Sequence, residues 1–418
     1  MNRVIRLLPV VSLCAVALCL GLTGCGNGTS STSSGDPNTI KIVSSLPRTG
    51  SAKGQTDTIV NGIKMAFDEV GYQVGDFKIV YEDLDDATAA QGAWTAEREA
   101  ANADQAVKDA DTMIYIGPYN SGAAKVSIPI LNKAGILMIS PAVTWPGMTK
   151  PGKGDPGEPG IYQPSGTPNF TRVVPADDIQ AAFGAKWAKK LGVTKVVVLD
   201  DNETYGKGIA TLFKENCREL GIKVIGGQQS IDPLQPNFRN LMAQIAGGEK
   251  PDLIYFGGTS QSKAPTIAKD ILAAGLRDVK FMVPDGCFEL TFIQQAGAET
   301  FKTLPTYVTF GGDPPDRATG KTKEFAEKYL AKYGKQPEGY AIYGYEAGKV
   351  AIEAIKKAGQ KDRAAILAAA FGIEDFDGAT GKWSFDKNGD TTARSMTGNT
   401  IENGAFKYAI QLSDLETE

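Results

Sequence analysis

The chain has 418 residues, of which 42% are apolar and 22% are charged, the balance of a globular protein with proper hydrophobic cores. Its formal net charge is −4, without long runs of like charge, which argues against a nucleic-acid partner. It contains no histidine, the commonest general base and metal ligand, and no metal-ligand spacing. We therefore expect no metal, no cofactor and no catalysis.

The first residues are typical of an export signal. Arg3 and Arg6 precede an almost wholly apolar run at 7–22, which leads into Leu22-Thr23-Gly24-Cys25. A retained membrane helix is the alternative, but the run contains Pro9 and is shorter than the ~20 residues that a bilayer crossing needs. The Leu-Thr-Gly-Cys box resembles the lipobox of bacterial lipoproteins, which implies cleavage at that box and acylation of Cys25. We expect residues 1–24 to be removed, leaving an exported protein, lipid-anchored in the cell membrane and facing the periplasm or the cell exterior.

Residues 25–38 are mostly small and polar, which predicts a flexible tether, and the folded body starts near Thr39. From there, short β-branched runs alternate with longer segments of helical periodicity. In chain order we expect strand 40–43, helix 58–70, strand 77–81, helix 87–108, strand 113–116, helix 123–133, strand 136–139, helix 180–191, strand 195–199, helix 205–220, strand 222–225, helix 238–245, strand 253–256, helix 264–274 and strand 280–283. Such alternation predicts βαβ units and parallel sheets covered by helices on both faces.

A Gly- and Pro-rich segment, 147–168, separates two βα series and predicts a long loop. After Pro305 the pattern is mostly helical, with helices at 323–333, 340–357 and 363–370 and a strand and turn at 381–390. The series predict an α/β fold of two doubly wound parallel-sheet lobes joined by three hinge segments, in a chain that acts as a monomer. We place lobe 1 at 39–175 plus 308–392, and lobe 2 at 176–307 plus 393–418.

Three motifs that suggest other functions are incomplete. Thr319-Gly320-Lys321-Thr322 resembles the end of a phosphate-binding loop, but Pro315 stands where that loop needs its first glycine. Residues 386–390 alternate carboxylates like a calcium loop, yet the glycine is misplaced and no Glu closes the loop, so a hairpin turn is the better account. Ser121 has no histidine to activate it as a nucleophile. A secreted hydrolase therefore has little support.

Two cysteines, Cys217 and Cys287, lie in the folded body. An oxidising compartment would allow a disulfide between them. We expect two free, partly buried thiols instead.

Polar segments follow the predicted strands, at the edge where open α/β sheets bind ligands. After strand 113–116 the chain reads Gly-Pro-Tyr-Asn-Ser-Gly. Its small residues and the free amides of a helix start favour an anion such as a carboxylate. The alternative is that Ser121 only caps the helix.

The next such segment identifies a family. Residues 135–142, Gly-Ile-Leu-Met-Ile-Ser-Pro-Ala, with Thr144 two positions on, closely resemble the periplasmic binding proteins for leucine, isoleucine and valine, the solute receptors of branched-chain amino acid ABC transporters. The resemblance runs the length of the body, through segments 41–50, 200–208, 255–258, 281–286 and 383–390. It implies the type I periplasmic binding protein fold, a ligand cleft that closes by a hinge, and docking of the closed form on a membrane permease.

The resemblance also implies roles for particular residues. Ser121 and Thr144 stand at the positions where the family binds the ligand's carboxylate. Ala142 stands at the position whose backbone accepts a hydrogen bond from the ligand's ammonium. Asp285 stands at the acidic position that pairs with the ammonium, and Tyr205 at an aromatic that packs over the ligand. The chemistry agrees, since hydroxyls and helix amides suit a carboxylate and a buried carboxylate suits a cation. The alternatives are that Asp285 is a solvated turn residue and that Tyr205 only packs at the start of a helix.

The chain departs from the family at three places. Lys53 stands where the family often has an aromatic, and is either a ligand contact for a second oxygen or a solvated lysine. Thr259 and Ser260 stand where the family can present a tyrosine, and Trp145 where a small polar residue is usual. We therefore expect an amino acid, branched-chain or related, and keep open an amide, a urea-like compound, an aromatic carboxylate, or a role as a ligand sensor.

Overall fold

The computed structural model describes residues 35–313 and 317–416. The expected leader and the lipidation residue Cys25 lie outside the described residues, as does most of the expected tether. No described helix is long and apolar enough to cross a membrane.

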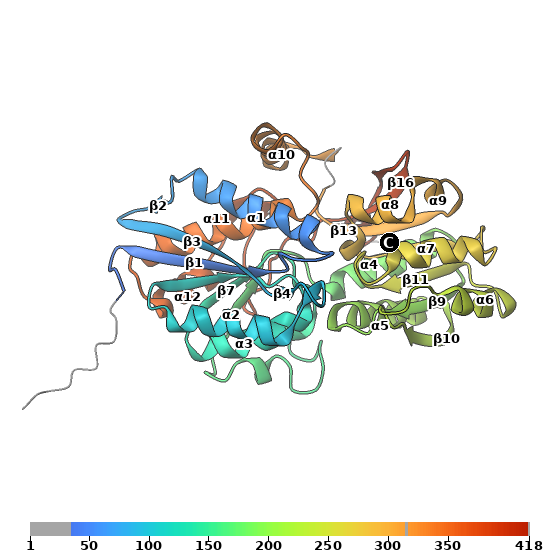
Figure 1. The fold of residues 1–418 in the computed structure, drawn as a ribbon, viewed down its shortest axis with the longest axis horizontal. Coiled ribbons are helices and arrows are strands. Elements are labelled where there is room, and N and C mark those ends of the chain that lie inside the picture. The colour runs from blue at the N-terminus through green and yellow to red at the C-terminus, as the bar shows by residue number, and fades with distance from the viewer. Residues whose placement is uncertain (1–34, 314–316, 417–418) are drawn as a thin grey trace, which may run out of the picture. The chain divides into compact units, whose positions relative to one another are not determined.

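A six-stranded sheet forms the centre of lobe 1, the name kept here for this sheet and its helices (Figure 1). Its order is β2 (Gln73–Val74), β3 (Phe77–Asp85), β1 (Thr39–Leu46), β6 (Thr112–Ile116), β7 (Leu137–Ser140), β8 (Phe170–Arg172). All neighbours are parallel except β2 and β3. One face packs on α1 (Lys53–Asp68), α11 (Ala341–Ala358) and α12 (Arg363–Phe371), the other on α2 (Ala96–Lys108) and α3 (Ser121–Lys133).

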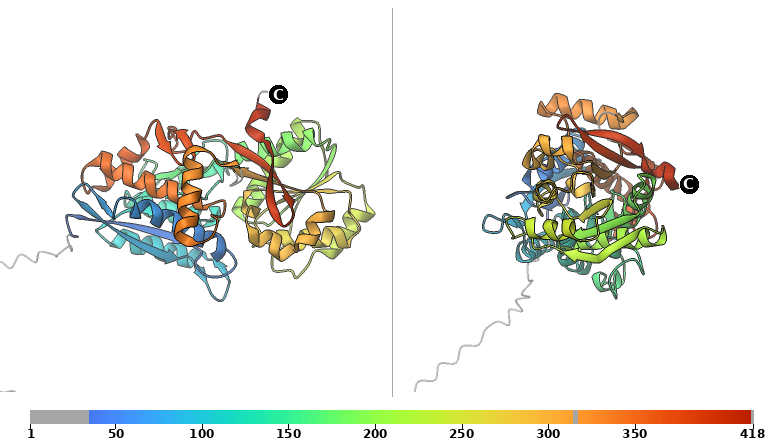
Figure 2. Two further views of the ribbon diagram at one scale, coloured as in Figure 1. Left: turned by 90° about the horizontal axis from the view of Figure 1, so that it is seen from above. Right: turned by 90° about the vertical axis from the view of Figure 1, so that its right-hand side faces the viewer.

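A seven-stranded sheet forms the centre of lobe 2 (Figure 2). Its order is β10 (Lys223–Ser230), β9 (Lys195–Asp200), β11 (Leu253–Gly257), β12 (Lys280–Val283), β13 (Thr306–Gly311), β16 (Met396–Glu402), β17 (Ala405–Gln411). The pairs from β10 to β13 are parallel, and the last two are antiparallel. One face packs on α4 (Asp177–Lys190) and α5 (Thr204–Glu219), the other on α6 (Arg239–Gly247), α7 (Ala264–Ala273), α8 (Leu290–Ala296) and α9 (Ala298–Thr303). The expected pair of doubly wound α/β lobes is confirmed.

The prediction of a helix at 87–108 is wrong for the first part of that range. Two short strands, β4 (Ala87–Thr88) and β5 (Ala93–Trp94), form a hairpin there. The turn includes Gly92 at φ 62°, and the Thr95 side chain then accepts a hydrogen bond from the Arg98 amide, which caps α2. A capping threonine marks a helix start more reliably than the alanine-rich composition of the preceding residues.

The segment after Pro305 contains more strand than expected. β13 pairs with β12 and β16, so the boundary expected between residues 307 and 308 moves beyond Gly311. The chain after residue 392, placed in lobe 2, forms a hairpin, β16–β17. The remaining elements are α10 (Gly320–Tyr333), β14 (Phe376–Gly378), β15 (Gly381–Trp383) and the short 3-10 helices Pro146–Met148, Gly160–Tyr162, Asp285–Cys287 and Leu412–Glu416.

Close helix packing fixes the wall of lobe 1 behind the cleft. A side chain on Gly62 of α1 would lie 2.1 Å from the Ala341 carbonyl oxygen, and one on Gly344 of α11 would lie 2.2 Å from that of Ile59. The two helices therefore approach backbone to backbone, which only glycine allows. This contact holds the middle of α1 against the first turn of α11.

Both cysteines of the body are free and buried. Cys217 lies on α5, and Cys287 ends a 3-10 helix beside the cleft. The expectation of two free thiols is confirmed.

Candidate functional site

A cavity lies where the carboxyl ends of strands from both sheets meet. Its empty space is about 280 Å³, with the open solvent at its mouth included. The lining comes from both lobes and consists of uncharged residues, namely Tyr119, Asn120, Ser121, Ala142, Tyr205, Thr259, Gly286 and Tyr340. Four of the seven predicted ligand residues are therefore brought together on one surface.

The lobe 1 side of the cavity is formed by the loops after β6 and β7. Asn120 is the N-cap of α3 and makes no side-chain cap bond, so the alternative that Ser121 merely caps this helix is wrong. Ser121 is instead the first helical residue, buried at 2% exposure, beside amides that have no partner within the helix. The Ser140 hydroxyl accepts hydrogen bonds from the amides of Ala142 (3.2 Å) and Val143 (2.9 Å), which shapes the second loop.

Asp285 lies just beneath the cavity, held from both lobes. The Tyr205 hydroxyl donates to its Oδ1 at 2.5 Å, and the Tyr340 hydroxyl, from lobe 1, donates to its Oδ2. The Gly286 amide in turn donates to the Tyr205 hydroxyl at 3.1 Å. Burial raises the pKa of Asp285, and the two phenol hydrogen bonds only partly offset this. A buried carboxylate of this kind is a strong partner for a cation.

A second buried carboxylate, Asp177, completes this cluster and was missed by the sequence reasoning. It is the first residue of α4, is fully buried, and neither carboxylate oxygen has a hydrogen-bond partner of normal geometry among the described residues. Burial and then the charge of Asp285 raise its pKa well above the usual range. The Asp177 amide donates to the Thr144 carbonyl at 2.9 Å, and the buried Thr144 hydroxyl also lacks a partner of normal geometry. The Asp-Asp pair at 177–178, just after a predicted hinge, was the available signal.

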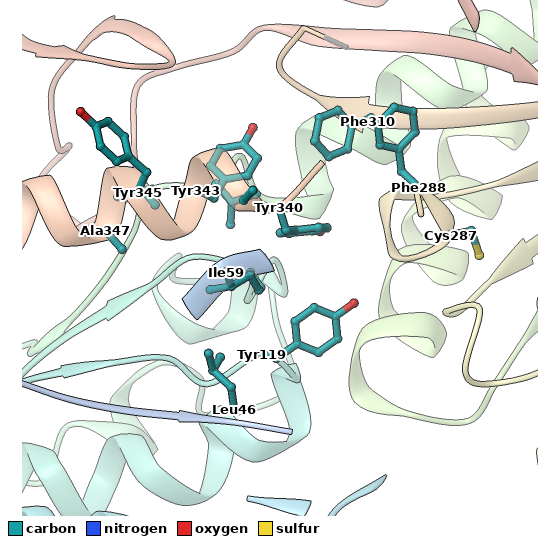
Figure 3. Packing of buried hydrophobic residues seen from close by; sticks show 14 of the residues in the cluster. Leu46, Ile59, Tyr119, Cys287, Phe288, Phe310, Tyr340, Tyr343, Tyr345 and Ala347 are labelled. Carbon is teal, nitrogen blue, oxygen red and sulfur yellow. The ribbon is translucent and has the colours of Figure 1, made fainter. Parts of the chain in front are cut away.

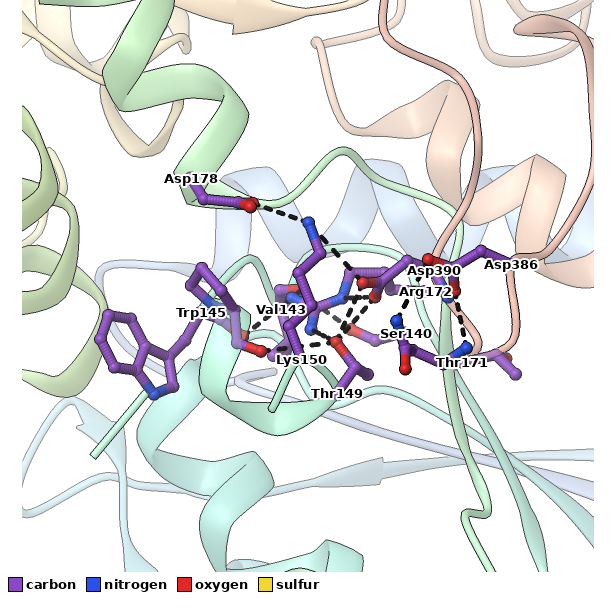
Figure 4. Close-up of polar contacts among 12 residues, drawn as sticks. Ser140, Val143, Trp145, Thr149, Lys150, Thr171, Arg172, Asp178, Asp386 and Asp390 are labelled. Atoms are coloured by element: carbon purple, nitrogen blue, oxygen red, sulfur yellow. Dashed lines mark hydrogen bonds and ion pairs between the residues drawn. The ribbon is translucent and has the colours of Figure 1, made fainter. Parts of the chain in front are cut away.

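A buried arginine fixes the loop that carries Thr144 (Figure 4). The guanidinium of Arg172 donates to the carbonyls on either side of Thr144, those of Val143 (3.1 Å) and Trp145 (2.9 Å). Its Nε pairs with Asp390 Oδ1 at 2.7 Å, and Arg172 has no exposed surface. The loop is thereby tied to the segment between β15 and β16, one of the connections between the lobes.

Aromatic side chains carry the apolar core from one lobe to the other beside the cavity (Figure 3). Tyr119 and Tyr340 point from lobe 1 toward Cys287 and Phe288 of lobe 2, and Phe288 stacks on Phe310 with ring centroids 4.3 Å apart. On another side, Trp145 of lobe 1 covers Gly208 on α5 of lobe 2, where an added Cβ would lie 2.5 Å from the indole. The lobes are therefore in direct contact around the cavity.

The other predicted residues lie differently. Thr259 lines the cavity and shares a turn with Ser262, whose hydroxyl accepts from the Thr259 amide at 2.8 Å. Lys53 lies outside the cavity lining, 54% exposed, and pairs with Asp57 of its own helix at 2.6 Å. The sequence reasoning named Tyr340 only as the start of a helix and did not single out Tyr119.

The arrangement suits a zwitterion. Asp177 and Asp285 offer two negative charges to a cationic group, while Ser121 and the amides at the start of α3 offer donors to an anionic one. Within residues 35–313 and 317–416 no cluster of carboxylates and thiols is arranged to hold a metal ion.

Comparison with known proteins identifies the family of this chain. The family of periplasmic binding proteins matches residues 39–405. The Leu/Ile/Val-binding protein BraC3 of Rhizobium johnstonii is 28% identical over 84% of this chain and 88% of its own length. A leucine-, isoleucine-, valine-, threonine- and alanine-binding protein of Pseudomonas aeruginosa is also 28% identical, over 84% of this chain and 87% of its own length.

Solved structures share the fold. The leucine-binding protein LivK of Thermotoga maritima is 26% identical and superposes with a TM-score of 0.77 over 89% of this chain and 98% of its own. A solute-binding protein from R. palustris in complex with benzoate is 19% identical, with a TM-score of 0.74 over 90% and 96% of the two chains. The chain therefore belongs to the periplasmic binding protein family, among the relatives of the leucine-, isoleucine- and valine-binding proteins.

Proposed function

We propose that this chain is a lipid-anchored extracytoplasmic solute-binding protein of an ABC importer, which binds an amino acid in the interlobe cleft and delivers it to a membrane permease. The observation that carries the amino acid is the pair of buried carboxylates, Asp177 and Asp285, at a cavity whose other side has the amides and hydroxyl at the start of α3. Burial raises the pKa of both acids, so their ionisation is costly. A ligand ammonium beside them offsets that cost.

Lobe contact couples this binding to delivery. Tyr340 of lobe 1 reaches Asp285 of lobe 2, so a group that binds Asp285 also interacts with an element of the opposite lobe. A ligand favours the closed form only through interactions that the open form lacks. The closed form is the species that we propose docks on the permease; a sensor that passes closure to a signalling partner would use the same step.

A thermal-shift screen of the mature protein tests the ligand class. Amino acids, amides and small carboxylates are compared at equal concentration, because a ligand that binds only the folded protein raises the melting temperature by mass action. We expect α-amino acids to give the largest shifts. If none shifts the transition while another class does, the proposal is wrong.

A carboxylate without an ammonium is the second candidate. The benzoate complex of the R. palustris structure and the three tyrosines of the cavity lining favour it. For such a ligand Asp285→Asn leaves affinity nearly unchanged, whereas an amino acid loses its charge partner.

Anchoring has a separate test. Cells given a labelled fatty acid should label the chain, and Cys25→Ala should abolish the label and release the protein from the membrane fraction. Cys217→Ala is the matched control, since this thiol is buried inside lobe 2 and should not affect labelling. Label retained in Cys25→Ala contradicts the lipid anchor.

A further inference from the structure

Beside the cavity lies a second set of buried polar groups whose hydrogen-bonding capacity is largely unused. Gln55, in the first turn of α1, is 1% exposed, and neither atom of its amide has a hydrogen-bond partner of normal geometry among the described residues. Ser260 is 3% exposed, and its hydroxyl also has no hydrogen-bond partner of normal geometry among the described residues. A buried polar group without a partner costs about 1–3 kcal/mol, so two such groups at one place need an explanation.

Glu289 adds a buried acid to this set. It is 2% exposed, and the Gln261 amide donates to its Oε1 at 2.7 Å. Among the described charged groups no lysine or arginine pairs with it, and its charged neighbour, Glu338, is also acidic. Burial raises the pKa of Glu289 to about 7. An ionised carboxylate in such a place is stabilised by a donor or a cation from outside the chain.

These groups meet at the cavity wall. Gln55 and Glu289 both act on Tyr119, which lines the cavity. Burial raises the pKa of Tyr119, and the charge of Glu289 raises it further. A side chain on Gly54 would lie 3.8 Å from the Thr291 hydroxyl, which brings the first turn of α1 next to that of α8. The Ser260 amide donates to the carbonyl of Gly286, another lining residue, at 3.1 Å. Gln55 thus approaches from lobe 1, and Ser260 and Glu289 from lobe 2.

We infer that Gln55, Ser260 and Glu289 form a side-chain subsite for a ligand whose side chain ends in N–H donors, such as an amide, an ammonium or a guanidinium. The inference rests on the proposed function, since Asp177 and Asp285 take the α-ammonium and these three residues take the other end. An aliphatic side chain would leave the Gln55 amide buried without a partner and the Glu289 carboxylate with only the Gln261 amide, at a cost that a donor-bearing side chain removes.

Isothermal titration of the mature protein with matched ligands tests this subsite. Lysine and norleucine have the same carbon chain and differ only in the terminal ammonium, and glutamine and arginine supply the amide and guanidinium. We expect at least one of the three polar ligands to bind ten times or more tighter than norleucine and leucine. Repeating the titration in buffers of different ionisation enthalpy measures the protons released on binding, which distinguishes a cationic ligand side chain from an amide. A cation beside Glu289 should release more protons at pH 7 than norleucine does, whereas an amide should release about as many as norleucine.

Variants locate the effect. Glu289→Gln and Gln55→Met keep side-chain size, and each should weaken the preferred polar ligand at least tenfold while norleucine changes less than twofold. Glu338→Gln is the matched control, because this neighbouring acid already accepts a hydrogen bond from the Leu290 amide and lies outside the cavity lining. Leucine or norleucine binding as tightly as every polar ligand overturns the subsite but leaves the proposed function in place. Binding of no α-amino acid overturns both.

Discussion

The two polar clusters of the cleft are built on different supports. Asp285 is held by phenols from both lobes, and the loop of its neighbour Thr144 is tied down by a buried arginine. Glu289 has one amide partner, and Gln55 and Ser260 have none of normal geometry among the described residues. A part of the ligand that is common to all amino acids needs a rigid receptor, whereas the variable part is recognised by a few side chains that can change without loss of the fold. The support beneath each cluster therefore indicates which end of the ligand it takes.

Removing the arginine clamp should have the largest effect. Arg172→Leu removes the closest cationic partner of the buried Asp390, leaving it Lys150 at 3.8 Å, and frees two loop carbonyls, so we expect the free energy of unfolding to fall by about 3–5 kcal/mol. Denaturant titration measures this loss. The exposed pair Arg394–Glu416 is the control, where Arg394→Leu should cost less than about 1 kcal/mol. Equal costs in the two variants would contradict a special role for the clamp.

Removing the charge of Asp285 should have the next largest effect. Asp285→Asn keeps the shape and can still accept from one of the two phenols, but it loses the ammonium's charge partner, so we expect amino acid affinity to fall by about 2–5 kcal/mol, roughly 30-fold or more. Titration calorimetry measures it, with circular dichroism to establish that the variant folds. A loss that is equal for an amino acid and for its deaminated analogue would break the assignment of this cluster to the ammonium.

The lobe contact at Gly208 should matter less. Gly208→Ala places a methyl group 2.5 Å from the Trp145 indole, and such overpacking costs about 1–3 kcal/mol in the closed form. We expect affinity for every ligand to fall by roughly 5- to 100-fold, because both clusters depend on closure. Adding Trp145→Ala should restore part of the loss in a double-mutant cycle. Additive losses would mean that the two residues do not meet when ligand binds.

The pH dependence should be the smallest effect. Burial raises the pKa of both Glu289 and Asp201 to about 7, above their values in the unfolded chain. The folded state therefore holds extra protons between about pH 4.5 and 7, and stability falls as pH rises through that window. We expect the melting temperature without ligand to be higher at pH 5.5 than at pH 8. Glu289→Gln should flatten the profile; an unchanged slope would mean that Glu289 is not the titrating group.

The sequence predicted the lobes, their alternating elements and half of the cavity lining, because parallel strands have strong β-branched runs and the binding loops follow them directly. It failed at 87–94, where an alanine-rich stretch forms a hairpin, and at β13, whose register depends on a partner strand some 90 residues away. Gln55 and Glu289 could not be singled out, since their burial is a property of the assembled lobes, and for Asp177 the Asp-Asp pair at 177–178 was the available signal.

The most direct test of the account is a comparison of one amino acid with its deaminated analogue, both titrated into the mature protein and into Asp285→Asn. The account predicts that the parent chain binds the amino acid at least 100 times more tightly than the deaminated acid, and that this ratio falls roughly 30-fold or more in the variant, where only Asp177 remains to pair with the ammonium. A deaminated acid that binds the parent chain as tightly as the amino acid would contradict it.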